Sequence, residues 1–208
     1  MHPTLNIAGL KIAAWKTYGF WAFWVGVVFI AIYPTCNWLT ANRETTYSLY
    51  INTELAIPFI PGFFWIYMSM YVLFLLPVFF LDAEQLKRLG KQLISATLLS
   101  GVIFLILPAE LGFERESPAS PLYASIYSGL FSVDLPHNLV PSLHVIFSSL
   151  IIFSLVENAR LKYQKYALWG WLTLVCLSTL LIHQHHLVDI ITGLLVAMFF
   201  KNFYKTGE

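Results

Sequence analysis

Charge is what this sequence has least of. Only 11% of its 208 residues are charged and 58% are hydrophobic, and the mean hydropathy is +0.70. A soluble globular domain carries about 25% charged residues, so this chain is short of the charge needed to cover a water-exposed surface. The net charge of +1 and the absence of a long basic run give no general attraction to nucleic acid. We therefore expect an integral membrane protein that does not bind nucleic acid.

Cysteine and metal-binding motifs are sparse as well. Cys36 and Cys176 lie in or beside apolar runs without metal-ligand spacing, so we expect two small buried side chains and no disulfide. The stretch 183–189 resembles a ligand set in composition. However, the adjacent His185 and His186 would point to different faces of a helix, and no His-Glu-x-x-His motif is present. A metal site is therefore the less favoured alternative, and we expect neither a metal nor a cofactor.

Six apolar runs are close to the length of a membrane span, which is roughly 20 residues. They cover residues 19–36, 62–81, 92–107, 141–156, 166–182 and 187–203. We expect a short charged turn at 82–91 and a short helix at the membrane interface at 122–131. The sequence thus predicts an all-α fold, a six-transmembrane-helix bundle that forms a single membrane domain over residues 1–208. Its segments 1–18 and 204–208 would be cytoplasmic.

Lysine and arginine are distributed unevenly between the two sides of these spans. Ten of the twelve lie in the N-terminal segment, the 82–91 turn, the 157–166 turn and the C-terminal end, whereas Arg43 and Arg115 lie on the other side. The positive-inside rule then places both termini in the cytoplasm and the connection 108–140 on the outside. The first span could be taken for a signal peptide, but no small-residue cleavage site follows it, so we expect an anchor. With the short loops, this favours a multi-pass protein of a bacterial inner membrane.

Two stretches place ionisable side chains at the outer edges of spans. They read Pro141-Ser142-Leu143-His144 and His183-Gln184-His185-His186-Leu187-Val188-Asp189. His185 and Asp189 are four residues apart, hence on one helical face, where the carboxylate can hold one imidazole nitrogen and leave the other as a nucleophile or base. His144 supplies a second imidazole that could act as a general acid. A lone histidine at a helix end more often caps the helix, so the hypothesis rests on the convergence of these residues.

The same edge has the features of an anion site. Ser142 is a natural N-cap, which would leave free backbone N–H groups pointing outward, and a helix N-terminus attracts anions. Arg115 is the candidate cation, since a guanidinium fits phosphate oxygens. An equally supported alternative is that Arg115 pairs with Glu110, Glu114 or Glu116 on a solvated loop.

The two stretches resemble the second and third signature motifs of the type 2 phosphatidic acid phosphatase family, which includes the vanadium haloperoxidases. Membrane members of that family have six helices with motifs placed in this way. Leu143 stands where the second motif usually has glycine, and a His-His pair precedes Asp189. Both features look more like the branch of fungal inositol phosphorylceramide synthases and their bacterial relatives. The stretches 56–61 and 134–138 also resemble bacterial members, and the resemblance covers about residues 52–200.

The resemblance implies metal-independent phosphoryl transfer on a membrane lipid at the non-cytoplasmic face. His185 would attack phosphorus to form a phosphohistidine, Asp189 would orient it, and His144 would protonate the leaving oxygen. His144 would then activate water, a small alcohol or a lipid as the acceptor. The residues expected to bind the substrate are Ser142, Arg115, Asn138, His183 and His186.

The sequence departs from the family pattern at two cations. The first motif is Lys, six residues, then Arg-Pro; here Arg115 matches the arginine, but Pro108 and Glu116 stand at the other positions. The third motif opens Ser-Arg, where this chain has Ser178-Thr179. The loss favours a phosphodiester, a diphosphate held partly elsewhere, or a site completed by His183, His186 or His137. We expect a lipid phosphatase or head-group phosphotransferase; the alternative is a catalytically silent lipid-binding or lipid-transport protein of the same fold.

Overall fold

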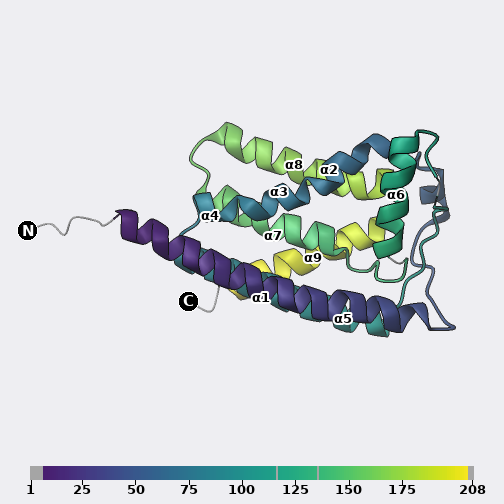
Figure 1. Ribbon diagram of the computed structural model, residues 1–208, viewed down its shortest axis with the longest axis horizontal. Helices are drawn as coiled ribbons and strands as arrows, with labels where there is room; N and C mark the ends of the chain where they lie inside the picture. The colour runs from purple at the N-terminus through teal and green to yellow at the C-terminus, as the bar shows by residue number, and fades with distance from the viewer. Residues whose placement is uncertain (1–6, 116, 135, 206–208) are drawn as a thin grey trace, which may run out of the picture.

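The computed structural model describes residues 7–115, 117–134 and 136–205, whose regular structure is helical (Figure 1). The longer helices are α1 (Ile7–Ala41), α5 (Ala83–Ile106), α6 (Pro121–Val133), α7 (Leu143–Asn158), α8 (Lys162–Leu181) and α9 (Leu187–Phe203). Between α1 and α5 lie two 3-10 turns, η1 (Asn52–Ala56) and η2 (Pro61–Phe63), and the short helices α2 (Phe64–Met68), α3 (Met70–Leu75) and α4 (Pro77–Phe80). The all-α expectation is confirmed for this part of the chain. Glu116, Leu135 and the terminal segments 1–6 and 206–208 lie outside the described residues.

The expected apolar runs coincide with helices. Residues 19–36 lie within α1, residues 62–81 cover η2 and α2–α4, and residues 187–203 are α9 itself. Two helices in the described ranges are long and apolar enough to cross a membrane, Lys11–Ala41 and Ala83–Ile106. Pro61–Leu75 and Leu143–Asn158 are shorter apolar helices. Passage of all six segments through a membrane remains a prediction.

The expectation of a charged turn at 82–91 is wrong, because residues 83–91 form the first part of α5. The Asp82 carboxylate accepts a hydrogen bond from the Gln85 N–H at 2.8 Å, and the Gln85 side chain accepts one from the Asp82 N–H at 3.0 Å. This reciprocal pair is a capping box, which starts the helix. Glu84 and Lys87 then form an ion pair at 3.3 Å. The charged residues therefore extend the apolar helix by about two turns.

The segment 64–80 is broken at two points, each with a local cause. Pro77 has no N–H to donate to the preceding turn, and the Leu76 N–H instead bonds the Leu73 carbonyl at 3.2 Å. At the other break, the Ser69 hydroxyl donates to the Ile66 carbonyl at 2.5 Å and accepts the indole N–H of Trp171 at 2.8 Å. Because Trp171 belongs to α8, the break at Ser69 is held by a neighbouring helix.

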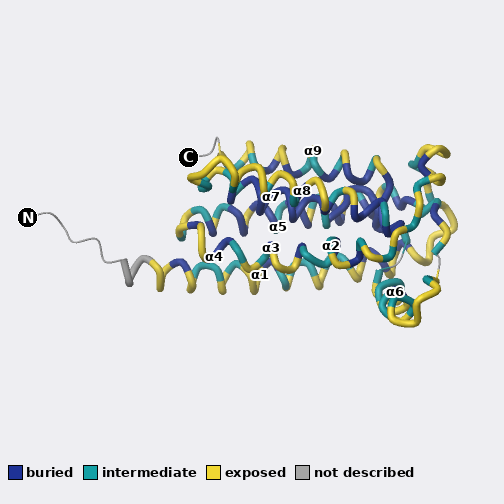
Figure 2. Tube along the Cα trace, turned by 90° about the horizontal axis from the view of Figure 1, so that it is seen from above, coloured by how far each residue is buried: buried dark blue, intermediate teal, exposed yellow. Residues whose placement is uncertain are grey.

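Helix α7 forms the centre of the bundle and packs against α5, α8 and α9. Most of its side chains are buried, whereas α1, α8 and α9 each have an exposed outer face (Figure 2). Helix α1 runs along α5, and two glycines of α5 permit a close approach. A Cβ on Gly90 would lie 2.6 Å from the Trp21 ring, and a Cβ on Gly101 would lie 2.4 Å from Cγ2 of Ile32.

Replacing Gly101 with alanine is expected to lower the unfolding temperature in detergent. Alanine is about 1 kcal/mol more favourable than glycine in a helix interior. At this site, however, the new Cβ would overlap Ile32, whose branched side chain has little rotamer freedom. Gly170→Ala in α8 is the matched control, because a Cβ there meets nothing within 4 Å and should stabilise the helix. If both variants unfold at the same temperature, the close contact between α1 and α5 is refuted.

Candidate functional site

The N-termini of α7 and α9 lie side by side at one end of the bundle. The Ser142 N–H donates to the Asp189 carbonyl at 3.1 Å. Gly193, one turn further into α9, permits this approach, because a Cβ there would lie 3.0 Å from the Ser142 carbonyl oxygen. The Ser142 hydroxyl accepts the Val145 N–H at 3.4 Å, so Ser142 is the N-cap of α7 as the sequence predicted. The stretches 141–144 and 183–189 are thus brought together.

His185 is held by the carboxylate of Asp189. Nδ1 of His185 lies 3.1 Å from Oδ2 of Asp189, and the same oxygen accepts the His186 N–H at 2.8 Å. Both side chains are buried, His185 at 5% and Asp189 at 1% exposure. A carboxylate can only accept, so it favours the proton on Nδ1 and leaves a lone pair on Nε2. That is the state a histidine nucleophile requires.

His144 faces the same region and is held by a tyrosine of α2. Its Nδ1 lies 3.0 Å from the Tyr67 hydroxyl, and the two rings are stacked at 3.9 Å. Its Nε2 is buried and has no hydrogen-bond partner among the described residues. Tyr67 is itself only 1% exposed, which fixes the position of its hydroxyl. When Nδ1–H donates to the Tyr67 oxygen, the unpaired Nε2 is the nitrogen left to give or take a proton.

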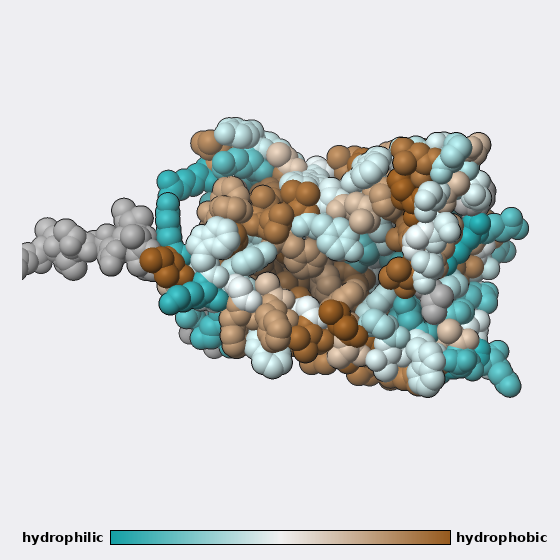
Figure 3. Space-filling model, in the orientation of Figure 1, coloured by the Kyte–Doolittle hydropathy of each residue, from teal (hydrophilic) through white to brown (hydrophobic). Residues whose placement is uncertain are grey.

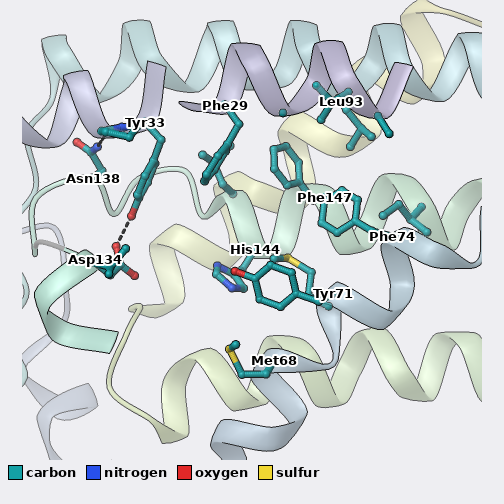
Figure 4. A pocket seen from close by; sticks show the side chains of 18 of the residues that line it. Phe29, Tyr33, Met68, Tyr71, Phe74, Leu93, Asp134, Asn138, His144 and Phe147 are labelled. Carbon is teal, nitrogen blue, oxygen red and sulfur yellow. Dashed lines mark hydrogen bonds between the residues drawn. The ribbon is translucent and has the colours of Figure 1, made fainter. Parts of the chain in front are cut away.

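Both histidines line a cavity of about 870 Å³ that extends between α1, the segment α2–α4, α5 and α7. Figure 4 shows His144 beside Tyr71 and Met68, with aromatic side chains continuing away from it along α1 and α7. At the histidine end the Tyr33 hydroxyl donates to the Asp134 carboxylate. In the space-filling view this face is hollowed between α1 and the segment α2–α4, with hydrophobic residues around the hollow (Figure 3). The cavity therefore joins a polar end to a long apolar interior.

Asn138, which was predicted to bind the substrate, also lines this cavity. Its amide donates to the Tyr33 carbonyl at 3.1 Å, and its oxygen accepts the Thr40 hydroxyl at 3.3 Å. Both partners belong to α1. Asn138 therefore ties the loop before α7 to the end of α1.

His183 and His186 pack within the connecting loops and do not line the cavity. Nε2 of His183 lies 2.9 Å from the Ile57 carbonyl. Nε2 of His186 accepts the Gly112 N–H at 3.0 Å, so its Nδ1–H can donate to Glu54 Oε2 at 3.2 Å. The Phe113 ring is sandwiched between the two imidazoles, at 4.0 Å from His183 and 4.4 Å from His186. Their ring contacts hold loops together beside the site.

Arg115 binds backbone carbonyls at the C-terminal end of α6. Its guanidinium donates to the carbonyls of Phe131 (at 3.1 Å) and Asp134, and lies over the Phe131 ring at 4.7 Å. Burial lowers the pKa of Arg115, and neighbouring Asp134 opposes this effect. A cation at a helix C-terminus complements the helix dipole. Arg115 does not line the cavity. Glu110, which was one of the glutamates expected as an alternative partner of Arg115, instead accepts the hydroxyls of Thr46 and Ser48.

Sequence reasoning missed Glu54 and Tyr67. Glu54 is 4% exposed, and its Oε2 accepts the Leu187 N–H at 2.8 Å as well as lying beside His186. An acidic residue in the largely apolar stretch 51–60 was a signal for such a role. Tyr67 carried no signal, since it is one of 11 tyrosines and its partner lies 77 residues away.

No protein-family model matches this chain, and neither does any curated protein. Within the part of the chain that the structure describes, no group of three or more His, Cys, Asp or Glu side chains is arranged to hold a metal ion.

Replacing Glu54 with alanine is expected to lower the free energy of unfolding by roughly 3 kcal/mol or more, since each hydrogen bond to a charged group contributes about 1.5–3 kcal/mol. The substitution would remove the acceptor of the N–H groups of Ile51 at 3.1 Å and Leu187 at 2.8 Å, and the partner of His186. Chemical unfolding in detergent, followed by circular dichroism, measures the change. Glu44→Ala, at an exposed position, is the control and should be neutral. Equal stability of the two variants would contradict the role given to Glu54.

Stability is expected to fall as the pH drops below about 6.5, the ordinary pKa of histidine. Burial lowers the pKa of His186, although Asp189 and Glu54 oppose the shift. Burial and the nearby positive charge of Arg115 lower the pKa of His137. These imidazoles bind protons more readily in the unfolded chain, so protonation favours unfolding and stability is retained above that pH. Unfolding temperatures across a pH series test this. His186→Gln should flatten the decline, and a wild-type protein that becomes more stable in acid would disprove it.

Proposed function

We propose that this chain is an integral membrane enzyme that transfers the phosphoryl or phosphate-linked head group of a lipid through a phosphohistidine on His185. The observation that carries the proposal is the pairing of two differently held imidazoles in one cavity. His185 is bound to a carboxylate, whereas His144 is bound to a phenol, and both line the same apolar-walled space. The motif resemblance to the type 2 phosphatidic acid phosphatases supports the same roles.

In the proposed reaction His185 is the nucleophile, and His144 first gives and then takes a proton. Nε2 of His185 attacks phosphorus while Asp189 holds Nδ1–H and stabilises the positive charge that forms on the ring. His144 enters this step as an imidazolium whose Nδ1–H donates to the Tyr67 oxygen. As the bond from phosphorus to the leaving oxygen breaks, its Nε2 proton goes to that oxygen and a neutral imidazole is left. His144 Nε2 then takes a proton from water or an acceptor hydroxyl, which attacks phosphorus and releases His185. Tyr67 supports this cycle because its hydroxyl oxygen accepts the Nδ1–H of His144, so that Nε2 is the nitrogen that gives and takes the proton.

The anion-binding side of the site favours a singly charged group. The described residues that line the cavity include no lysine or arginine, and Arg115 is engaged by α6. Ser178 and Thr179, where the family has a cation, donate to carbonyls of their own helix. The N-terminus of α7 remains as an anion site, with the backbone N–H groups of Leu143 and His144 facing the N-terminal end. This balance favours a phosphodiester, or a diphosphate held partly outside the cavity, over a phosphomonoester dianion.

The membrane arrangement is part of the proposal. We propose six spans, formed by α1, the segment η2–α4, α5, α7, α8 and α9, with the histidine end on the non-cytoplasmic side of a bacterial inner membrane. Two of these helices pass the length and hydropathy test for a span, and α1 begins at the same end of the bundle at which α9 ends (Figure 1). Ten lysines and arginines at that end favour its cytoplasmic placement.

A lipid-binding or lipid-transport protein without catalysis is the second candidate. The observation in its favour is the shortage of cations, since a phosphoryl-transfer site ordinarily neutralises the charge that develops on the equatorial oxygens. The two candidates differ in one measurable property, turnover.

His185→Ala is expected to abolish release or exchange of the lipid head group, and His144→Ala to slow it by about 10²–10⁴-fold, the range of general acid–base catalysis. The measurement is phosphate release or head-group exchange by purified protein from a panel of lipid phosphates, diphosphates and phosphodiesters. A radiolabelled substrate should also leave an acid-labile phosphohistidine on wild-type protein and none on His185→Ala.

Tyr67→Phe provides a sharper test, because it removes the hydroxyl and keeps the ring that stacks on His144. Its activity should fall with a displaced pH profile, whereas Tyr163→Phe, at a site 67% exposed, should retain the wild-type profile. Full activity of both histidine variants would eliminate the roles proposed for the two histidines, whereas no turnover by the wild-type protein would leave the binding protein.

A further inference from the structure

The cavity is far larger than two imidazoles and a phosphate require. Its volume of about 870 Å³ lies near the top of the range of roughly 300–1,000 Å³ for small-molecule sites. Three of its polar lining groups, Tyr33, Asp134 and Asn138, lie toward the histidine end. The rest of the lining is apolar or aromatic and includes Phe29, Phe74, Leu86, Leu93 and Phe147.

The apolar part is long. Along α1 the lining runs from Ala41 back to Tyr18, a separation of 23 residues over which a helix rises by about 35 Å. The hydrocarbon core of a bilayer is about 30 Å thick, so the cavity extends well past the depth that a chain reaches within one leaflet. A polar end joined to a long apolar passage matches an amphiphile whose phosphate lies at His144 and His185.

The cavity is bounded on its open side by two tyrosines of α1. Near the histidines, Tyr33 donates to the Asp134 carboxylate; at the far end, Tyr18 donates to the Phe74 carbonyl at 2.8 Å. These two bonds are 15 residues apart on α1, about 22 Å of helix. Helix α1 packs mainly on α5 and meets the opposite wall chiefly at α4. Figure 3 shows a hollow on this face between α1 and the segment α2–α4.

An indole lies close to the far end, about one turn of α1 nearer the histidines than Tyr18. Trp21 lines the cavity and lies against Gly90, where even a Cβ would come within 2.6 Å of the ring. The absence of a side chain at Gly90 lets the Trp21 ring lie flat against α5. Gly26, one and a half turns further along α1, also lines the cavity, and a Cβ there meets nothing within 4 Å.

On the basis of the proposed function, we propose that this cavity is a site for one long, linear hydrocarbon chain of the lipid substrate. The chain passes between the two tyrosine bonds, lies along α1 with its phosphate end at His144 and His185, and ends against Trp21. Trp21 and Gly90 thereby set the chain length that the enzyme prefers.

The test compares alkyl(methyl)phosphinates of increasing chain length, which carry the singly charged phosphorus end that the site favours and have no P–O ester bond to hydrolyse. Their affinities for wild-type protein in detergent should rise by about fourfold for each methylene buried, until the chain reaches Trp21. Gly26→Leu should fold normally, since the space is open, and should weaken binding of long chains by at least about 15-fold, the equivalent of two methylenes. Short chains should bind as before.

Two matched controls accompany this variant. Gly19→Leu makes the same change in the same helix at a position that is also open and does not line the cavity, so it should keep the wild-type chain-length profile. Trp21→Ala should move the preferred length to longer chains. Trp65→Ala, at a residue 58% exposed and outside the cavity, should leave it unchanged.

The outcomes separate this inference from the proposed function. Chain-length binding that responds to Gly26→Leu and Trp21→Ala supports the chain site, even if no lipid phosphate is turned over and the enzymatic proposal fails. If the wild-type protein turns over its substrate, and Gly26→Leu and Gly19→Leu have the same chain-length profile, the enzymatic proposal stands and the chain site is overturned. Affinities that do not depend on chain length would overturn it as well.

Discussion

The site depends on the buried carboxylate of Asp189. Its Oδ2 accepts hydrogen bonds from the His185 ring and the His186 N–H, and its backbone carbonyl accepts the Ser142 N–H. Asp189 is 1% exposed, and burying a carboxylate costs free energy unless its oxygens accept hydrogen bonds. The local fold therefore depends on these bonds. They hold the first turn of α9, the His185 ring and the start of α7 as a single unit.

Glu54 repeats this arrangement on the other side of the α9 N-terminus. Its carboxylate binds the Ile51 N–H, the Leu187 N–H and the His186 ring, and His186 in turn accepts the Gly112 N–H. Two buried carboxylates thus converge on one helix N-terminus, where the helix dipole favours negative charge. The loops that follow α1 and α5 are thereby attached to the helix that carries the candidate nucleophile.

The two walls of the cavity differ in how firmly they are held. His144 and His185 belong to the buried centre, since α7 packs against α5, α8 and α9. The opposite wall is α1, which packs along α5 and is joined across the cavity by the bonds of Tyr18 and Tyr33. Two histidines on a packed core, facing a wall that is held at its two ends, suit the proposed site, which would fix a phosphate and admit a hydrocarbon chain.

The sequence by itself determined what depends on local spacing. The helix at 187–203 follows from its apolar run, and the Ser142 cap follows from its separation of three residues from Val145. The His185–Asp189 contact was also predicted, but not as a pair on one helix face, because His185 precedes the N-cap His186 and reaches Asp189 from outside α9. The helical start of α5 was missed because charge was taken as a sign of a turn, although Asp82 and Gln85 form a capping box. Only the tertiary structure decided that Tyr67 meets His144, that Arg115 turns to α6, and that α1 leaves a cavity open along α7. These depend on side-chain directions and helix approach between segments far apart in the chain, which packing sets and no local pattern encodes.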